Sequence, residues 1–167
     1  MASKAQAVAA IPEDVNGKAI NRASAAAFIA RFEKLKPGTK AAWGKLTMET
    51  VVPHLIAAVK MSMGDAPALP FIGNWVSTTF LWPLMRTGWF SIPKNLTIKG
   101  PDGKPLPAIL SPGETTTLAE TIEEFLRRRE AGTMKCTLHP VFGDVGPDGW
   151  AVLHAMHIKH HLKQFGL

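Results

Sequence analysis

The sequence predicts an all-α fold: a bundle of four principal helices with one long loop or crossover and an extra apolar helical segment. Apolar residues recur at helical spacing in four segments, and proline- and glycine-rich stretches separate them. No strand-helix alternation, glycine-rich phosphate loop or internal repeat occurs. With 167 residues, 46% of them hydrophobic and 19% charged, the chain is long enough to bury the core of one domain.

The domain is expected to occupy residues 21–167, after a loose N-terminal tail at 1–20. A first helix is predicted over 21–35, where Phe28 and Phe32 are spaced as on one helix face, with a Pro-Gly stop after it. The tail has no strong hydrophobic run of the kind a secretory signal needs.

The second helix is predicted to follow Thr47, which can act as its N-cap, and to end at Gly64. Pro53 falls beyond the first turn of this helix. A proline there should cost a hydrogen bond or bend the helix beside His54.

An uncharged run at 69–85 suggests a third helix from about Phe71 to Met85, interrupted near Pro83. The run has only 17 residues and includes polar side chains, so a core or a pocket wall is favoured over a membrane span. A turn-rich loop is expected over 93–112.

The next helix is predicted over 111–131, where an apolar stripe includes Ile122 and Phe125. The terminal helix is expected to open near Pro147. It carries four of the six histidines within eight residues, which makes it a candidate metal site.

Two of these histidines form an HxxxH pair. Residues advance by about 100° on a helix, so His161 lies only about 40° from His157 and one turn away. By the same count His154 and Gln164 share this face, while His160 lies towards a flank. A divalent ion usually needs at least three protein ligands. His54 on the second helix is the natural third ligand; a solvated helix face without metal is the competing interpretation.

Several blocks in order resemble a domain-of-unknown-function branch of the DinB/YfiT-like superfamily. The clearest is His157-Ile-Lys-His160-His161-Leu-Lys-Gln164-Phe165. The earlier blocks are 34–37, 42–47, 52–55 and 139–143. The resemblance covers roughly residue 26 to the end.

This resemblance implies an antiparallel four-helix bundle, often a homodimer, with a three-histidine metal centre. The implied ligands are His54, His157 and His161, and the implied metal is zinc or nickel. Relatives of this kind use the metal for transferase or isomerase chemistry with low-molecular-weight thiols. His154 and Gln164 are the candidates for orienting a ligand or transferring a proton.

The leading functional hypothesis is therefore a metal-dependent enzyme that activates a thiol or water against a small organic substrate. The alternative is a non-enzymatic small-molecule or lipid-binding bundle with a structural or vestigial metal site. The net charge is +6, but the basic residues are scattered and no nucleic-acid module is present, so no nucleic-acid partner is expected. A membrane partner is not expected either.

The remaining chemistry-bearing residues have plainer interpretations. His139 is expected to cap a loop, and each of the five tryptophans is expected in the core. The single Cys136 cannot form an internal disulfide; we expect an inert buried thiol and a cytoplasmic location.

Overall fold

The computed structural model describes residues 17–87, 90–106 and 116–167. Over these residues the chain is all-helical, with five α-helices and one π-helical turn and no strand. The elements in order are α1 (Arg22–Phe32), α2 (Met48–Ser62), η1 (Ser77–Leu81), α3 (Trp82–Met85), α4 (Leu118–Glu130) and α5 (Gly146–Gln164). The predicted fold class is confirmed.

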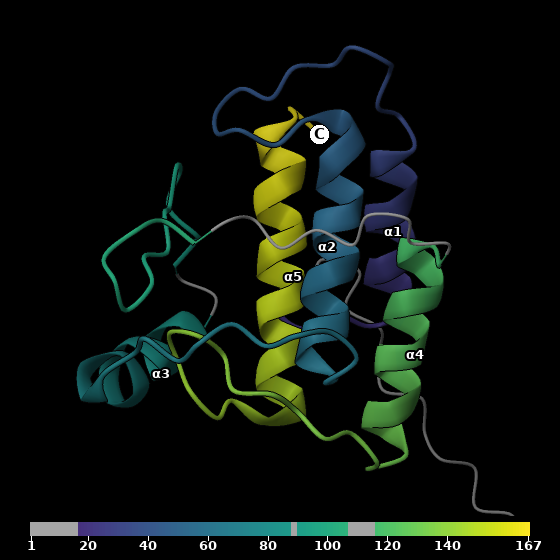
Figure 1. The fold of residues 1–167 in the computed structure, drawn as a ribbon. Helices are drawn as coiled ribbons and strands as arrows, with labels where there is room; N and C mark the ends of the chain where they lie inside the picture. The colour runs from purple at the N-terminus through teal and green to yellow at the C-terminus, as the bar shows by residue number, and fades with distance from the viewer. Residues whose placement is uncertain (1–16, 88–89, 107–115) are drawn as a thin grey trace, which may run out of the picture.

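The four longer helices lie side by side, and η1 with α3 projects away from them (Figure 1). Helix α2 contacts α4 and α5, and α1 contacts the same two helices. Side chains without exposed surface fill the space between them, among them Val51, Phe125, Ala151 and Ala155. Burial of this apolar surface is the main term that stabilises the bundle.

Local sequence decides where the helices begin. Asn21 caps α1, because its Oδ1 accepts from the Ser24 amide at 2.8 Å. Thr117 caps α4: its Oγ1 accepts from the Glu120 amide at 3.2 Å, and its own amide donates to the Glu120 carboxylate at 2.7 Å. The predicted start at 111 differs from this helix start at Leu118, and residues 111–115 lie outside the described part.

The tail was predicted at 1–20. Residues 1–16 lie outside the described part of the chain, and 17–20 lie inside it. These last residues pack against the bundle. The Ile20 side chain is 1% exposed, and its amide donates to the Ala151 carbonyl at 2.9 Å. The Gly17 carbonyl accepts from Lys159 at 2.7 Å.

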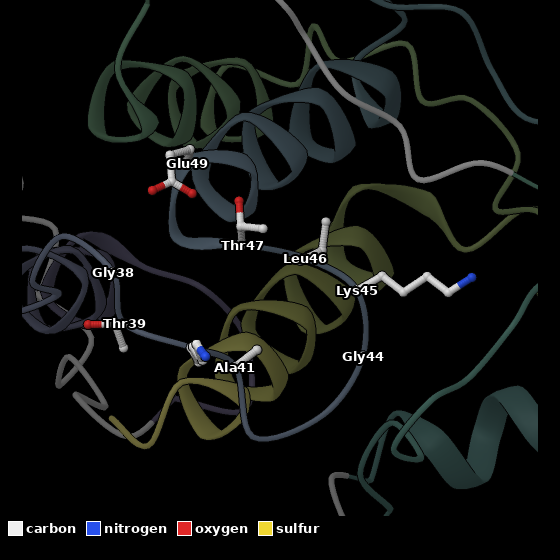
Figure 2. Close-up of a pocket in the computed structure, with 9 residues that line it drawn as sticks. Gly38, Thr39, Ala41, Gly44, Lys45, Leu46, Thr47 and Glu49 are labelled. Carbon is white, nitrogen blue, oxygen red and sulfur yellow. The ribbon is translucent and has the colours of Figure 1, made fainter.

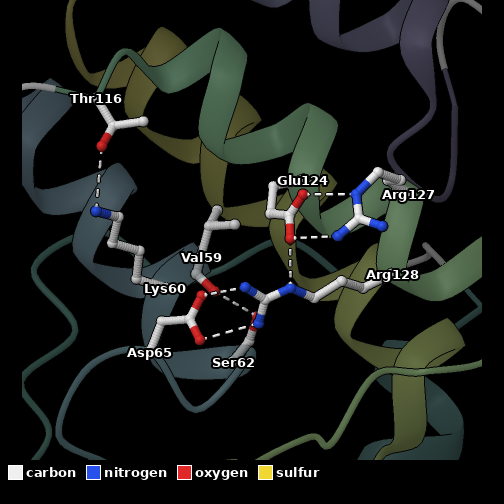
Figure 3. Close-up of polar contacts among 8 residues, drawn as sticks. All are labelled: Val59, Lys60, Ser62, Asp65, Thr116, Glu124, Arg127 and Arg128. Atoms are coloured by element: carbon white, nitrogen blue, oxygen red, sulfur yellow. Dashed lines mark hydrogen bonds and ion pairs between the residues drawn. The ribbon is translucent and has the colours of Figure 1, made fainter.

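Ion pairs join the C-terminal ends of α2 and α4 (Figure 3). Arg128 reaches Asp65 at 2.8 Å and Glu124 at 2.7 Å, and Glu124 also accepts from Arg127. These guanidinium groups hold the pKa of Glu124 low, at about 2. The charges on this helix are therefore paired, and the ion pair with Asp65 joins α4 to the turn that follows Ser62.

The apolar segment differs from its prediction at both ends. The helix starts at Trp75 rather than Phe71, because Asn74 caps it and the amides of Ile72 and Gly73 donate instead to the Pro140 carbonyl. It also runs through Pro83 without the predicted interruption. The π-turn η1 ends just before that proline, and the Trp82 amide donates to Ser77, which avoids the usual clash of a proline ring in an α-helix.

This segment is not core throughout. Trp82 is buried, but Trp75 is 69% exposed and Phe80 is 61% exposed. Within the described residues, no helix combines the length and the apolar character that crossing a bilayer requires.

Candidate metal centre

The HxxxH pair lies on α5 as the helical spacing predicts. Leu153, Ile158 and Leu162 on this helix are buried in the core, which fixes the rotation of α5 about its axis. That rotation places His157 and His161 on the side facing α2. Their Nε2 atoms stand 2.9 Å apart.

The third histidine comes from α2. Helix α2 runs antiparallel to α5, so its early residue His54 meets the late residues of α5, and the His54 Nε2 lies 3.0 Å from the His157 Nε2. Helix α2 continues through Pro53 from Met48 to Ser62. The proline thus removes one backbone donor without ending the helix, and His54 still reaches the pair.

Gln164 fixes the protonation of His161. The Gln164 amide nitrogen donates to the Trp43 carbonyl at 2.6 Å, because a carbonyl can only accept. The Gln164 Oε1 therefore faces His161 and accepts from its Nδ1 at 2.7 Å. With the proton on Nδ1, the neutral His161 ring presents a lone pair at Nε2, the form that a metal ligand requires.

The backbone of Gly44 permits this arrangement. Gly44 has φ +78°, and a Cβ at that position would stand 2.5 Å from the Gln164 Nε2. A larger residue would push the amide away from its partner. Sequence reasoning missed this loop, because the acceptor is the backbone carbonyl of Trp43 and no side chain signals it.

The three Nε2 atoms cannot all be satisfied by protons alone. Burial and the neighbouring imidazoles lower the pKa of His157 well below its usual value, and burial lowers that of His161 to about 4, so both rings are neutral near pH 7. A neutral His157 Nε2 carries at most one proton, yet it contacts two nitrogens. Since the His161 Nε2 carries no proton, the His157 Nε2 cannot both donate to His161 and accept from His54, so one of the two short nitrogen–nitrogen contacts has no proton between its atoms.

A divalent cation bound by the three Nε2 atoms would satisfy both of these contacts. The ligand atoms of His54, His157 and His161 all lie within 4.8 Å of one another. Nitrogens bound at 2.0–2.1 Å in tetrahedral geometry stand about 3.3–3.4 Å apart, so small side-chain rotations suffice. The three histidines could therefore hold a metal ion, as the sequence predicts.

The centre is not sealed from solvent. His161 is buried, whereas His54 and His157 are half-buried. Three protein ligands leave a tetrahedral ion at least one further position, and such an open position is typical of catalytic rather than structural sites.

His154 lies elsewhere, despite its place on the same face of the helical wheel. Its Nε2 contacts the Ser62 Oγ at 2.8 Å, and that hydroxyl donates to the Val59 carbonyl at 2.7 Å. His154 must then donate, as a neutral ring packed against Phe125 and Trp150. Burial lowers its pKa to about 3. Its partners are Ser62, Phe125 and Trp150, and the role predicted for it, orienting a ligand or transferring a proton, stays a prediction.

The two other histidines have separate partners. His139 Nδ1 accepts from the amides of Val141 and Phe142 at 3.1 and 3.2 Å, which confirms the predicted loop cap. Burial lowers its pKa to about 4. His160 lies on the flank, as predicted, and its Nδ1 donates to the Ile92 carbonyl at 3.2 Å.

The tryptophans and the cysteine divide between buried and exposed positions. Trp82 and Trp150 are in the core, but the prediction of a core position is wrong for Trp75, which lies on a projecting helix. Trp89 lies outside the described residues. Cys136 is half-buried, and burial raises its pKa, so a neutral thiol is favoured.

One surface pocket does not belong to the centre. It has a volume of about 340 Å³ and is formed by the loop before α2 and the first turn of that helix, with Thr39, Thr47 and Glu49 among its lining residues (Figure 2). No histidine lines it. The loop contacts the centre through Gln164: the Ala42 amide donates to its carbonyl, the Trp43 carbonyl accepts from its side chain, and Gly44 leaves room for that side chain.

Comparison with known proteins gives a family without an assigned activity. Neither the curated proteins nor the solved structures yielded a match. A family model described as a protein of unknown function, DUF1569, matches residues 18–166. The described bundle and all three histidines fall inside the matched range, and the chain therefore belongs to the DUF1569 family.

Proposed function

We propose that the protein is a metal-dependent enzyme whose centre consists of His54, His157 and His161. The observation that carries the proposal is the meeting of three Nε2 atoms in a half-buried position, with one ring oriented by Gln164. A bound divalent ion would supply Lewis-acid chemistry and lower the pKa of a thiol or water.

The residues of the chain supply the rest. His54 and the α5 pair hold the ion from two helices, so the centre depends on the packing of α2 against α5. Gln164 keeps His161 in the required tautomer and ring orientation. The resemblance to DinB-like proteins favours zinc or nickel, a small thiol as one substrate, and transferase, isomerase or hydrolase-like chemistry.

Metal analysis of the purified protein tests the centre. We expect one equivalent of divalent metal in the wild type and at least about a hundredfold weaker binding in His54→Ala and His161→Ala, because each removes a ligand. His160→Ala is the matched control: it removes a neighbouring imidazole outside the triad and should keep the metal. Full metal content in both triad variants would refute the site.

A second experiment tests the open position. Cobalt-loaded protein is titrated with a small thiol, and the visible and near-ultraviolet absorption is followed. A new sulfur-to-cobalt charge-transfer band supports thiol activation; a spectrum indifferent to thiols, azide and cyanide means a closed structural site.

A second candidate function rests on the exposed apolar side chains of the projecting segment. Phe71, Trp75, Phe80 and Leu84 are all exposed there. Such a surface fits a non-enzymatic bundle that binds a hydrophobic ligand or lipid, and it also fits the homodimer that the resemblance implies. Native mass spectrometry after metal removal and liposome flotation distinguish these alternatives.

A further inference from the structure

A second pocket lies beside α5, on the side of Trp43 and residues 90–94. Its volume is about 330 Å³. Helix α5 contributes Met156, Lys159, His160 and Lys163. This volume is at the lower end of the roughly 300–1,000 Å³ of small-molecule sites, so a small ligand fits it.

The pocket is basic. Lys18, Lys94 and Lys163 line it, and none of its lining residues is acidic. Within 17–87, 90–106 and 116–167, no carboxylate pairs with these three ammonium groups. The arginines of α4 differ, because Arg127, Arg128 and Arg129 all have acidic partners. Unpaired positive charge around a hollow attracts an anion.

Trp43 supplies a flat apolar wall. The Lys94 Nζ lies 4.6 Å from the centre of its ring, and the His160 ring meets it edge-on at 6.1 Å. Phe90, Ile92 and Met156 add further apolar surface. A ligand with a flat apolar body would contact these side chains while its charge lies near the lysines.

Trp43 also carries a polar atom that needs a partner. Its Nε1 is buried and has no hydrogen-bond acceptor among the described residues. A buried donor without an acceptor is unfavourable, and natural structures usually satisfy such groups with protein, water or ligand. The Trp43 ring itself lines the pocket, so a ligand bound there changes the surroundings of this indole.

We propose that this pocket binds a small organic anion, a flat apolar body that carries a carboxylate. The inference does not depend on the proposed function, since none of the three metal-centre histidines lines the pocket. The pocket nevertheless adjoins the centre, because the His160 and His161 rings lie 5.1 Å apart and the Trp43 carbonyl holds Gln164.

Metal-stripped full-length protein is titrated with 2-naphthoate, and binding is followed by calorimetry and by the indole ¹H–¹⁵N resonances. The Trp43 resonance is assigned as the one missing from Trp43→Phe. We expect it to shift with naphthoate and to remain unmoved by 2-naphthylmethanol, which has the same rings without the charge.

The double variant Lys94→Gln/Lys163→Gln should bind naphthoate about tenfold more weakly, since two exposed charges are lost. Lys40→Gln, an exposed lysine outside this pocket, should leave the affinity unchanged. Equal binding of the alcohol, an unchanged affinity in the double variant, or no binding at millimolar naphthoate overturns the proposal. Because the protein is metal-free throughout, failure here is distinct from failure of the metal centre.

Discussion

Helices α2 and α5 meet through histidines at two levels, and the two contacts have opposite hydrogen-bond balances. At the level of Ser62, every proton has an acceptor: His154 donates to the hydroxyl, and the hydroxyl donates to Val59. At the level of His54, one of the two short contacts between Nε2 atoms has no proton between them. The hydrogen bonds of the first contact are complete as they stand, whereas the three histidines of the second could hold a metal ion. Two histidines three residues apart on α5 thus have different surroundings: His154 contacts Ser62 in the core, and His157 belongs to the three histidines that could hold a metal ion.

The largest stability effect is expected at the complete contact. His154→Ala leaves a cavity among Trp150 and Phe125 and removes the partner of Ser62, so unfolding free energy should fall by about 2–4 kcal/mol. Urea denaturation measures the loss, and metal analysis provides the contrast. An unchanged metal content is expected. Loss of metal from a folded variant would mean that His154 contributes to metal binding.

Added metal should stabilise the protein by binding His54, His157 and His161. At a free metal concentration a hundred times the Kd, the gain in unfolding free energy is about 2.7 kcal/mol. Thermal unfolding with and without a chelator measures it. His157→Ala should show no such gain, and an equal gain in that variant would mean that the ion binds elsewhere.

Gln164→Leu tests how the orientation of His161 is achieved. Loss of the Oε1 acceptor frees the ring and its tautomer, and metal affinity should fall by about 10–100-fold. Competition with a chromophoric chelator measures the affinity. Gln164→Glu retains an acceptor and should bind metal more tightly than the leucine variant. Equal metal affinities in all three proteins would mean that Gln164 does not orient His161.

The complete contact also predicts sensitivity to acid. Burial, and secondarily the charge of His139, holds the pKa of His154 at about 3, below the ordinary 6.5. Below pH 6.5 the unfolded chain gains a proton that the folded chain refuses. Stability should therefore decline as pH falls from about 6.5 towards 3, by up to about 1.4 kcal/mol per pH unit from this group.

Metal-free wild type and His154→Ala are compared by urea denaturation between pH 7 and 4. The variant should show the shallower decline. Parallel curves would mean that His154 does not contribute to the acid dependence.

The sequence predicts the contact of His54, His157 and His161 but not the contact of His154 with Ser62. Helical spacing alone pairs His157 with His161, because both lie on one element whose rotation the apolar residues determine. His54 required the second helix to pack antiparallel, which periodicity does not specify and the family resemblance supplied. The wheel placed His154 beside the pair, but it could not show that Ser62 lies opposite it.

Other features escaped prediction because they depend on tertiary contacts or backbone geometry. The Trp43 carbonyl that holds Gln164 carries no side-chain signal. The π-turn that carries the chain through Pro83 replaces the predicted break, and the Asn74 cap shortens that helix at its start. The N-cap position of Thr47 was predictable because a cap acts locally, whereas α1 ends at Phe32 rather than at the predicted residue 35.

The central proposal is that His54, His157 and His161 form a metal centre with an open position. A crystal structure of protein grown with zinc, with anomalous data at the zinc edge, tests it most directly. The account predicts one ion bound by the three Nε2 atoms at about 2.0–2.1 Å, with a water or buffer oxygen as a further ligand. Zinc at other residues, or three histidines that remain metal-free in zinc-saturated crystals, would contradict it.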